Sequence, residues 1–251
     1  MYGVFFCKFE SQYYEMKKQF IIFLILLTSL GFSQEITQDS VAIQVDSLYR
    51  EDQFYTNITY NALVNIPDNL KQNKFSTGLS LGFLRDMPIN KNRTYSVAIG
   101  AGYSYSAYNH NLYQYNIINA NNQNQNVYET ISDNTSYNEN RQSMHFVDFP
   151  LELRWRNSTP NSHKFWRVYT GFKVSYLFSD TYKFVNSLQT VVIKNNPDLN
   201  KWQYGVYLTS GWNTWNLYIY YGLNGLYKDI KIDNKTANLQ TLNIGLQFYI
   251  L

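Results

Sequence analysis

Residues 242–250 read LNIGLQFYI, in which Leu242, Ile244, Leu246, Phe248 and Ile250 alternate with Asn243, Gly245, Gln247 and Tyr249. Successive side chains of a β-strand point to opposite faces, so this period of two predicts a strand with one face in an apolar environment. The polar face carries small, uncharged residues, and this feature helps to identify the apolar environment.

The same alternation recurs along the second half of the chain and in the residues before it. The predicted strands cover residues 53–65, 74–85, 94–108, 143–156, 165–178, 201–212, 215–223 and 239–250. Each is long enough to cross a bilayer as a tilted strand, and no amphipathic helix is predicted between them. We therefore predict an all-β fold, an eight-stranded antiparallel up-and-down transmembrane β-barrel over residues 53–251.

The predicted connections alternate in length. Short ones cover residues 86–93, 157–164 and 213–214, and longer ones cover residues 109–142, 179–200 and 224–238, while 66–73 is intermediate. Outer-membrane barrels have short periplasmic turns and long extracellular loops. An even number of strands then places both ends of the barrel in the periplasm.

Two features favour a membrane barrel over a soluble, ligand-binding barrel. The polar faces of residues 74–85 and 94–108 are rich in Gly and Ser, which suit a narrow lumen better than a water-facing surface. Aromatic rings also gather beside the short turns with outward parity, as in a girdle at the periplasmic membrane interface. The predicted girdle consists of Phe83, Tyr95, Trp155, Trp166, Trp212, Trp215 and Phe248.

The beginning of the chain has the layout of an export signal. Residues 16–33 contain a basic start at Met16, an apolar run and small residues before Gln34, which predicts a signal peptide cleaved after Ser33. The apolar run is too short for a transmembrane helix. We expect translation to begin at Met16, residues 1–15 to be a mis-called start, and residues 34–52 to form a periplasmic lead-in. The single cysteine, Cys7, precedes the signal, so the exported protein has no disulfide.

Charged residues occupy the predicted inward faces of two neighbouring strands. A lumen charge network is predicted from Asp148, Glu152, Arg154, Arg167 and Lys173, with Arg156 on the same inward face. Symmetric pairing about residues 157–164 would place Asp148 opposite Lys173, Glu152 opposite Tyr169, and Arg154 opposite Arg167. These residues form either a charge-compensated plug, which the narrow interior of eight strands favours, or a conduction or ligand site.

The residues that could carry catalysis are few. The histidines are His110, His145 and His163. Ser143 and His145 have the parity opposite to that of Asp148, which argues against a catalytic relay. No metal-ligand spacing or phosphate-binding glycine loop is present in the sequence, so we expect neither an enzyme nor a cofactor.

Composition narrows the choice of partners. Aromatic residues make up 18% of the chain and charged residues 16%, and the net charge of +3 gives no reason to expect a nucleic-acid partner. Residues 109–142 are rich in Asn and Tyr, so they form either a solvated loop or a docking surface for a protein or glycan. Residues 127–131 and 191–194 are expected to extend their neighbouring strands above the membrane.

The chain resembles the PorT-type outer-membrane β-barrel proteins of bacteria that use type IX secretion. The resemblance rests on residues 16–34, on FSTGLSLGFLR at 75–85, on the Gly-rich strand at 96–105 and on FPLELRW at 149–155. It implies an integral outer-membrane protein and, for the founding branch, an accessory role in secretion.

Two functions remain open at this point. The barrel is expected to be an accessory or assembly protein of type IX secretion or of another surface machine. The alternative is a stand-alone structural or surface-binding barrel with no transport role. The expected partners are outer-membrane lipid and, through the extracellular loops, other envelope or secretion proteins.

Overall fold

The computed structural model describes residues 52–250 except 73, 119–121, 123, 158–165, 213, 229 and 234. The expected start at Met16, the signal peptide at 16–33 and nearly all of the lead-in at 34–52 lie outside the described residues, as does His163. In the described part of the chain, no helix is long and apolar enough to span a membrane.

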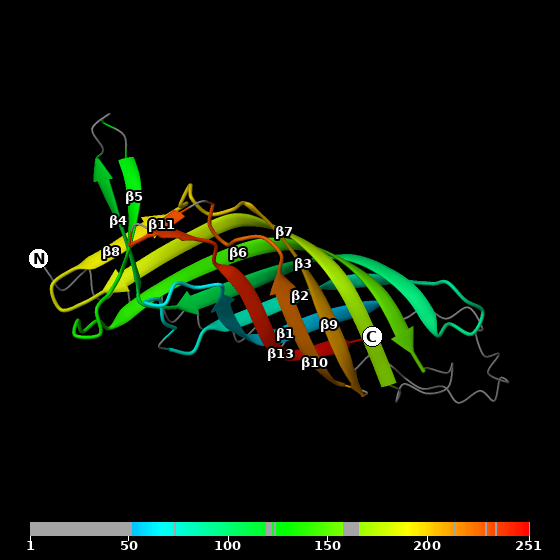
Figure 1. Cartoon of the computed structure of the whole chain (residues 1–251). Helices are drawn as coiled ribbons and strands as arrows, with labels where there is room; N and C mark the ends of the chain where they lie inside the picture. The colour runs from blue at the N-terminus through cyan, green and yellow to red at the C-terminus, as the bar shows by residue number, and fades with distance from the viewer. Residues whose placement is uncertain are drawn as a thin grey trace, which may run out of the picture. The chain divides into compact units, whose positions relative to one another are not determined.

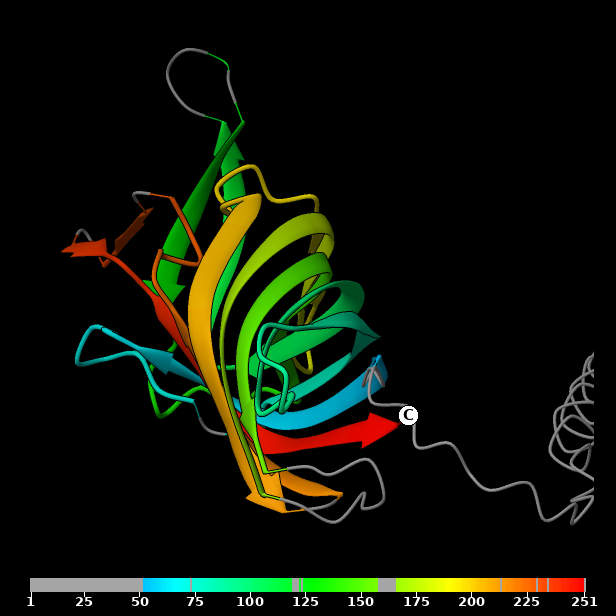
Figure 2. The same ribbon diagram turned by 90° about the vertical axis from the view of Figure 1, so that its right-hand side faces the viewer.

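Eight strands close into an antiparallel barrel, which confirms the predicted fold (Figures 1 and 2). They pair in the order β6-β3-β2-β1-β13-β10-β9-β7, and the pairing of β7 with β6 closes the ring. The barrel strands are β1 (Gln53–Val64), β2 (Thr77–Pro88), β3 (Tyr95–Asn109), β6 (Glu139–Arg156), β7 (Trp166–Val185), β9 (Trp202–Trp212), β10 (Trp215–Gly222) and β13 (Gln240–Ile250). Most bounds agree with the predicted ones within about three residues, but β6 and β7 are longer at the long-loop end.

The barrel has its apolar face outside. The outward side chains of β6 are between 37% and 58% exposed, and they are Val147, Phe149, Leu151, Leu153 and Trp155. Their inward neighbours are nearly inaccessible and mostly polar, with Glu152 and Arg156 at 0%. A soluble protein shows the reverse arrangement, whereas membrane barrels alternate apolar-out and polar-in.

The apolar band on the outside has the height of a membrane core. It runs along β6 from Trp155 to His145, where the outward side chains become polar, and this distance is about 25 Å for a strand tilted by about 40°. Charged side chains follow, where Glu139 forms ion pairs with Arg141 at 2.8 Å and Lys183 at 2.6 Å. The extra residues of the two long strands, the first of β6 and the last of β7, lie beyond this band.

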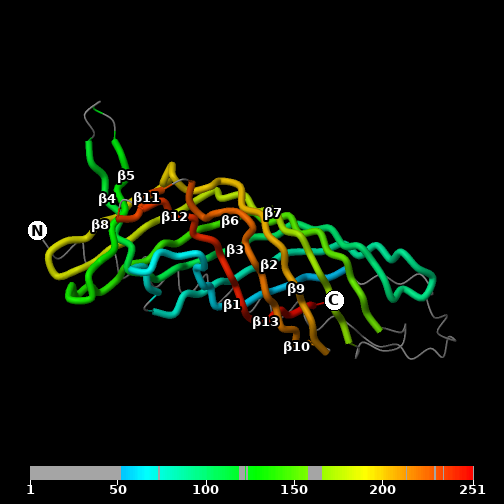
Figure 3. Tube along the Cα trace, viewed as in Figure 1, coloured from blue at the N-terminus to red at the C-terminus, as the bar shows by residue number. Residues whose placement is uncertain are grey.

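Five further strands gather at the long-loop end and form a cap (Figure 3). They are β4 (Leu112–Ile118), β5 (Asn124–Thr130), β8 (Thr190–Lys194), β11 (Ile230–Ile232) and β12 (Lys235–Ala237). β8 pairs with the end of β7, as expected for residues 191–194. β12, β11, β5 and β4 form a separate four-stranded sheet.

The expectation that residues 127–131 extend a barrel strand is wrong, because β5 pairs with β4 in that separate sheet. The chain leaves β3 at His110 and Asn111. The Asn111 side chain donates to the carbonyl of Asn69 at 2.9 Å and accepts from the backbone N–H of Lys71 at 2.7 Å. These bonds to the β1–β2 loop turn the chain away from the barrel wall.

Candidate functional site in the barrel lumen

Asp86 is the centre of a buried charge cluster at the short-turn end of the lumen. Its carboxylate accepts hydrogen bonds from Arg156 at 2.8 Å, from Arg154 at 3.1 Å and from the Ser96 hydroxyl at 2.7 Å. The side chains of Asp86, Arg154 and Arg156 are all 0% exposed. Arg156 also donates through Nε to the carbonyl of Arg93 in the β2–β3 turn, at 3.1 Å. The cluster therefore ties the three neighbouring strands β2, β3 and β6 together on the lumen side of the wall.

Glu152 extends this cluster towards β9, which β7 separates from β6 in the barrel wall. One of its oxygens accepts from Arg154 Nε at 2.7 Å, and the other accepts from the Tyr207 hydroxyl of β9 at 2.9 Å. The predicted proximity of Glu152 and Arg154 is present. Because both carboxylate oxygens have donors from different strands, the ion pair also cross-links the barrel wall.

A second ion pair lies nearer the middle of the barrel. Lys173 Nζ is 3.4 Å from Asp148, whose other oxygen accepts from the Ser175 hydroxyl at 2.6 Å. Lys173 Nζ also lies 4.5 Å from the centre of the Tyr220 ring, within the range of a cation–π contact.

The predicted pairing of β6 with β7 is wrong by two residues. Arg156, not Arg154, lies opposite Arg167, and Lys173 lies opposite Pro150. The prediction assumed a connection symmetric about residues 157–164, and the observed register is displaced by two residues relative to that assumption. A shift of two keeps every side chain on its face, so Lys173 still reaches Asp148, but diagonally.

Tyrosine rings fill the space between the charged groups. The guanidinium carbon of Arg154 lies 4.9 Å from the Tyr169 ring centre, and that of Arg167 lies 5.3 Å from the Tyr249 ring centre. Glycines also give tyrosine rings room, since a Cβ at Gly171 would collide with the ring of Tyr207, its partner on the neighbouring strand β9. The inward glycines and tyrosines are thus complementary parts of one packing.

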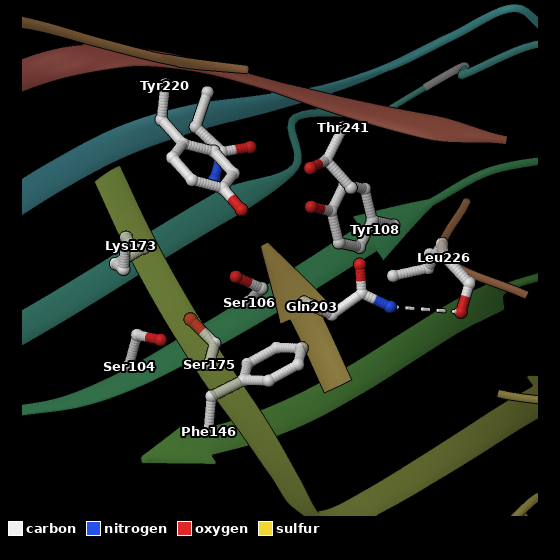
Figure 4. Close-up of a pocket in the computed structure, with 11 residues that line it drawn as sticks. Ser104, Ser106, Tyr108, Phe146, Lys173, Ser175, Gln203, Tyr220, Leu226 and Thr241 are labelled. Carbon is white, nitrogen blue, oxygen red and sulfur yellow. Dashed lines mark hydrogen bonds between the residues drawn. The ribbon is translucent and has the colours of Figure 1, made fainter. Parts of the chain in front are cut away.

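Only small cavities remain between these groups. One, on the cap side of Lys173, has a volume of about 30 Å³ and is shown in Figure 4, where side chains of several strands converge on it. The Gln203 side chain lines this cavity and donates to the carbonyl of Leu226 at 3.4 Å. Another, between Lys173 and Glu152, has a volume of about 10 Å³. Spaces of this size hold about one or two water molecules, so the described part of the lumen has no room for a larger solute.

The other end of the lumen is closed by a mainly apolar core under the cap. Its fully buried side chains include Leu112, Met144, Leu199 and Leu239, each at 0% exposure. Polar groups complete it: the Gln114 amide donates to the Tyr227 hydroxyl at 2.9 Å, and the buried Asp180 carboxylate accepts from the backbone N–H of Asn196 at 3.0 Å. Two chemically different closures therefore seal the two ends of the barrel.

His110 lies at the base of the cap, outside the barrel strands. Its Nδ1 accepts from the backbone N–H of Leu112 at 3.2 Å, and the side chain is buried. Burial lowers the pKa of His110 to about 4, because a charged imidazole would lose its hydration there.

The seven residues of the predicted aromatic girdle lie at the short-turn end with outward parity. Trp166 pairs with Trp212 across β7 and β9 with ring centres 5.5 Å apart, and Phe248 packs against Trp215 at 5.4 Å. Six of the rings are between 37% and 65% exposed, and Phe248 is half-buried; the six are Phe83, Tyr95, Trp155, Trp166, Trp212 and Trp215.

Ser143, His145 and Asp148 are not brought together. His145 faces outward and its Nδ1 is 2.7 Å from the Tyr103 hydroxyl, while Asp148 faces the lumen. Across the described residues, no group of three His, Cys, Asp or Glu side chains could hold a metal ion.

Sequence reasoning missed Asp86, the residue that joins the charge cluster. It was assigned to the turn at residues 86–93, whereas β2 continues to Pro88. Asp86 continues the inward parity of Gly78, Ser80 and Gly82, so extending the alternation by a few residues would have placed it in the lumen.

Comparison with known proteins gives one family. The model described as "Outer membrane protein beta-barrel domain" matches residues 32–228, more than three-quarters of the chain. The match ends before β13, the strand that joins β1 to β10. No curated protein matches the chain. One solved structure, titled "Asymmetric conductivity of engineered proteins", aligns over 80% of this chain and 100% of its own at 9% identity, with a TM-score of 0.15, which is too low to support any argument.

Proposed function

The chain belongs to the outer membrane protein beta-barrel domain family, and from this premise we propose that it is a non-conducting barrel that serves as an accessory or assembly protein of a secretion or surface machine. The observation that carries the proposal is the filled lumen. The cavity of about 30 Å³ inside the barrel has a buried ion cluster on one side of it and an apolar core on the other. A barrel without a path for solutes acts through its surfaces.

The cap supplies the surface for that role. It contains a four-stranded sheet outside the barrel wall, which a structural anchor in the membrane does not need. We place the cap on the cell exterior and the aromatic girdle at the periplasmic interface, because long loops of such barrels face outwards. The resemblance to PorT-type barrels makes type IX secretion the first machine to test. We propose no catalytic role.

The test is deletion of the gene in the native host, followed by quantification of exported proteins. Loss of export, restored by the full-length protein, supports the accessory role. A shortened protein, with residues 116–126 replaced by Asn-Gly, removes the outer half of the β4–β5 hairpin and keeps the Tyr115–Val127 pair that closes the new turn. It is expected to insert normally and to fail to restore export. Normal export in the deletion strain would contradict the accessory role.

A second candidate is a stand-alone surface barrel with no transport role. It is favoured by the extent to which the cap is ordered by contacts within this chain, such as the Tyr128 hydroxyl donating to Asp198 at 2.7 Å and Asn196 donating to Tyr128 at 2.9 Å. For this candidate, the deletion strain exports normally and instead shows altered binding or altered envelope stiffness.

A further inference from the structure

One strand of the cap has an edge that is only partly paired. β5 pairs with β4 along its whole length, from Asn124 to Thr130. On its other side it pairs with β11 at a single position, Tyr128 with Ile232, in the parallel direction. The β4–β5 hairpin projects beyond β11 (Figures 1 and 3), so the first half of β5 has no neighbouring strand there.

The hydrogen bonds at the end of β5 show which of its backbone groups face that open side. The N–H of Ile131 donates to Asn111, on the side of β4, at 2.8 Å. The N–H of Thr130 donates to the side chain of Asp233, on the side of β11, at 3.1 Å. Because successive residues of a strand present their backbone groups to opposite sides, Asn126 and Asn124 share the direction of Thr130. Their N–H and C=O groups therefore point into the open space beside β5.

That space has the size of a short strand. It is a cavity of about 700 Å³, lined by β5 on one side and by Lys228, Ile230 and Lys231 on the other. A residue in a sheet occupies about 3.3 Å by 4.8 Å by 10 Å, roughly 160 Å³. The cavity thus matches about four residues, the length of β5 that precedes its pairing with β11.

The charged groups that line the cavity are of both signs, with the carboxylates of Glu129, Asp198 and Asp233 and the ammonium groups of Lys228 and Lys231. The carboxylate of Asp198 accepts from Asn126 at 2.8 Å, and that of Asp233 accepts from the Thr130 hydroxyl at 2.6 Å. Lys228 donates to the carbonyl of Pro197 at 2.8 Å. Among the contacts of the described residues, the Lys231 ammonium has no carboxylate within ion-pair distance. The third carboxylate, Glu129, accepts from the Tyr115 hydroxyl at 2.9 Å. Because these donors are neutral, the carboxylates keep their charge, and recognition of an occupant rests on the backbone edge of β5 rather than on the charge of the lining.

We propose that the free edge of β5 binds an extended segment of a partner protein, which adds as a strand beside Asn124 and Asn126. A peptide backbone repeats its N–H and C=O groups at the spacing of this edge, which a glycan does not. The inference rests on the proposed function in that it gives the partner a chemical class, an extended peptide. Binding of such a peptide can be measured on the cap without any assay of secretion.

The experiment uses the full-length protein in detergent and a fluorescent peptide, acetyl-Thr-Val-Thr-Glu-Val-Thr-Val-amide. Saturable binding measured by anisotropy is expected, together with slower amide exchange at Asn124 and Asn126. The variant Asn126→Pro removes one edge N–H without removing a bond to β4 and is expected to weaken binding at least tenfold. Asn126→Ala loses the same side chain but keeps the N–H, and it is the matched control, expected to bind within about threefold of wild type.

Several outcomes would overturn the proposal. They are no binding of the peptide to the wild-type protein, equal binding by Asn126→Pro and Asn126→Ala, and equal binding of a peptide whose alternate amides are N-methylated. If the wild-type protein is a dimer and only Asn126→Pro is a monomer, the edge pairs with a second copy of the chain instead, and the proposal is overturned. Secretion does not enter this assay, so normal export in a deletion strain would contradict the accessory role and leave the binding result intact.

Discussion

The two ends of the barrel are closed by different chemistry. At the short-turn end, Asp86, Arg154 and Arg156 form ion pairs between side chains that are 0% exposed. At the cap end, leucines such as Leu112 and Leu199 pack at 0% exposure, and the polar groups around them are mostly neutral amides and hydroxyls, with Asp180 as a buried carboxylate. The ionic closure depends on every partner being present, whereas the apolar closure depends on packed volume. The following predictions test this difference, from the largest effect to the smallest.

The largest effect is expected from Asp86→Ala. The variant leaves Arg154 and Arg156 buried without their shared carboxylate, and loss of one partner of a buried ion pair costs about 3–5 kcal/mol. Equilibrium unfolding in detergent or lipid measures the change in free energy. A loss below about 1 kcal/mol would show that the cluster is hydrated and that it does not close the lumen.

Removal of apolar volume from the cap is expected to have a smaller and more local effect. Leu112→Ala should cost about 2–4 kcal/mol and should accelerate hydrogen exchange in β4 and β5 while the barrel strands stay protected. Ile118→Ala, on the same strand but 72% exposed, is the control and should change stability by less than about 0.5 kcal/mol. If Leu112→Ala accelerated hydrogen exchange in the barrel strands as much as in β4 and β5, the apolar closure would not be separate from the barrel.

Acid is expected to loosen the cap through His110. Its pKa is lowered to about 4 when folded, against about 6.5 when unfolded, so the unfolded state binds more protons between these values. Stability is therefore complete above about pH 6.5 and falls as the pH decreases towards 4, by about 2 kcal/mol at pH 5. Hydrogen exchange of β4 at pH 7.5 and pH 5 measures this. The variant His110→Asn should lack the change, and an unchanged pH response in that variant would assign it to another group.

The smallest effect is expected from an ion pair outside the lumen. Lys71 and Asp133 are 2.7 Å apart, with side chains 52% and 70% exposed. Asp133→Asn should cost less than about 1 kcal/mol, because solvent screens the pair. The free energy of unfolding of Asp133→Asn is compared with that of Asp86→Ala, which contrasts an exposed ion pair with a buried one. Similar losses of stability in the two variants would contradict the special role of the buried pair in closing the lumen.

The alternation of side chains could predict the barrel but not the cap. Membrane strands must satisfy every backbone group within a closed sheet and present an apolar face to lipid, so residues 201–212 or 239–250 carry a clear signal. Side-chain parity also placed Glu152, Arg154 and Lys173 together on the inward face. The register of β6 with β7 depends on the connection between them, which parity does not determine.

The cap lies outside the band where lipid imposes alternation. β5 begins with three polar residues, Asn124, Gln125 and Asn126, and does not alternate as the barrel strands do. No pattern in the sequence therefore indicates that β5 pairs with β4 rather than with a barrel strand. The bonds of Asn111 to the β1–β2 loop link residues about 40 positions apart, and local sequence carries no record of them.

The central claim is that the lumen is closed, and conductance across a planar bilayer tests it most directly. Wild-type protein, with insertion verified by its heat-modifiable band, is expected to show no stable conductance above the bare membrane, because the cavities of about 30 Å³ and 10 Å³ are separated by the Lys173–Asp148 pair. A stable, large conductance from the inserted wild-type barrel would contradict the account.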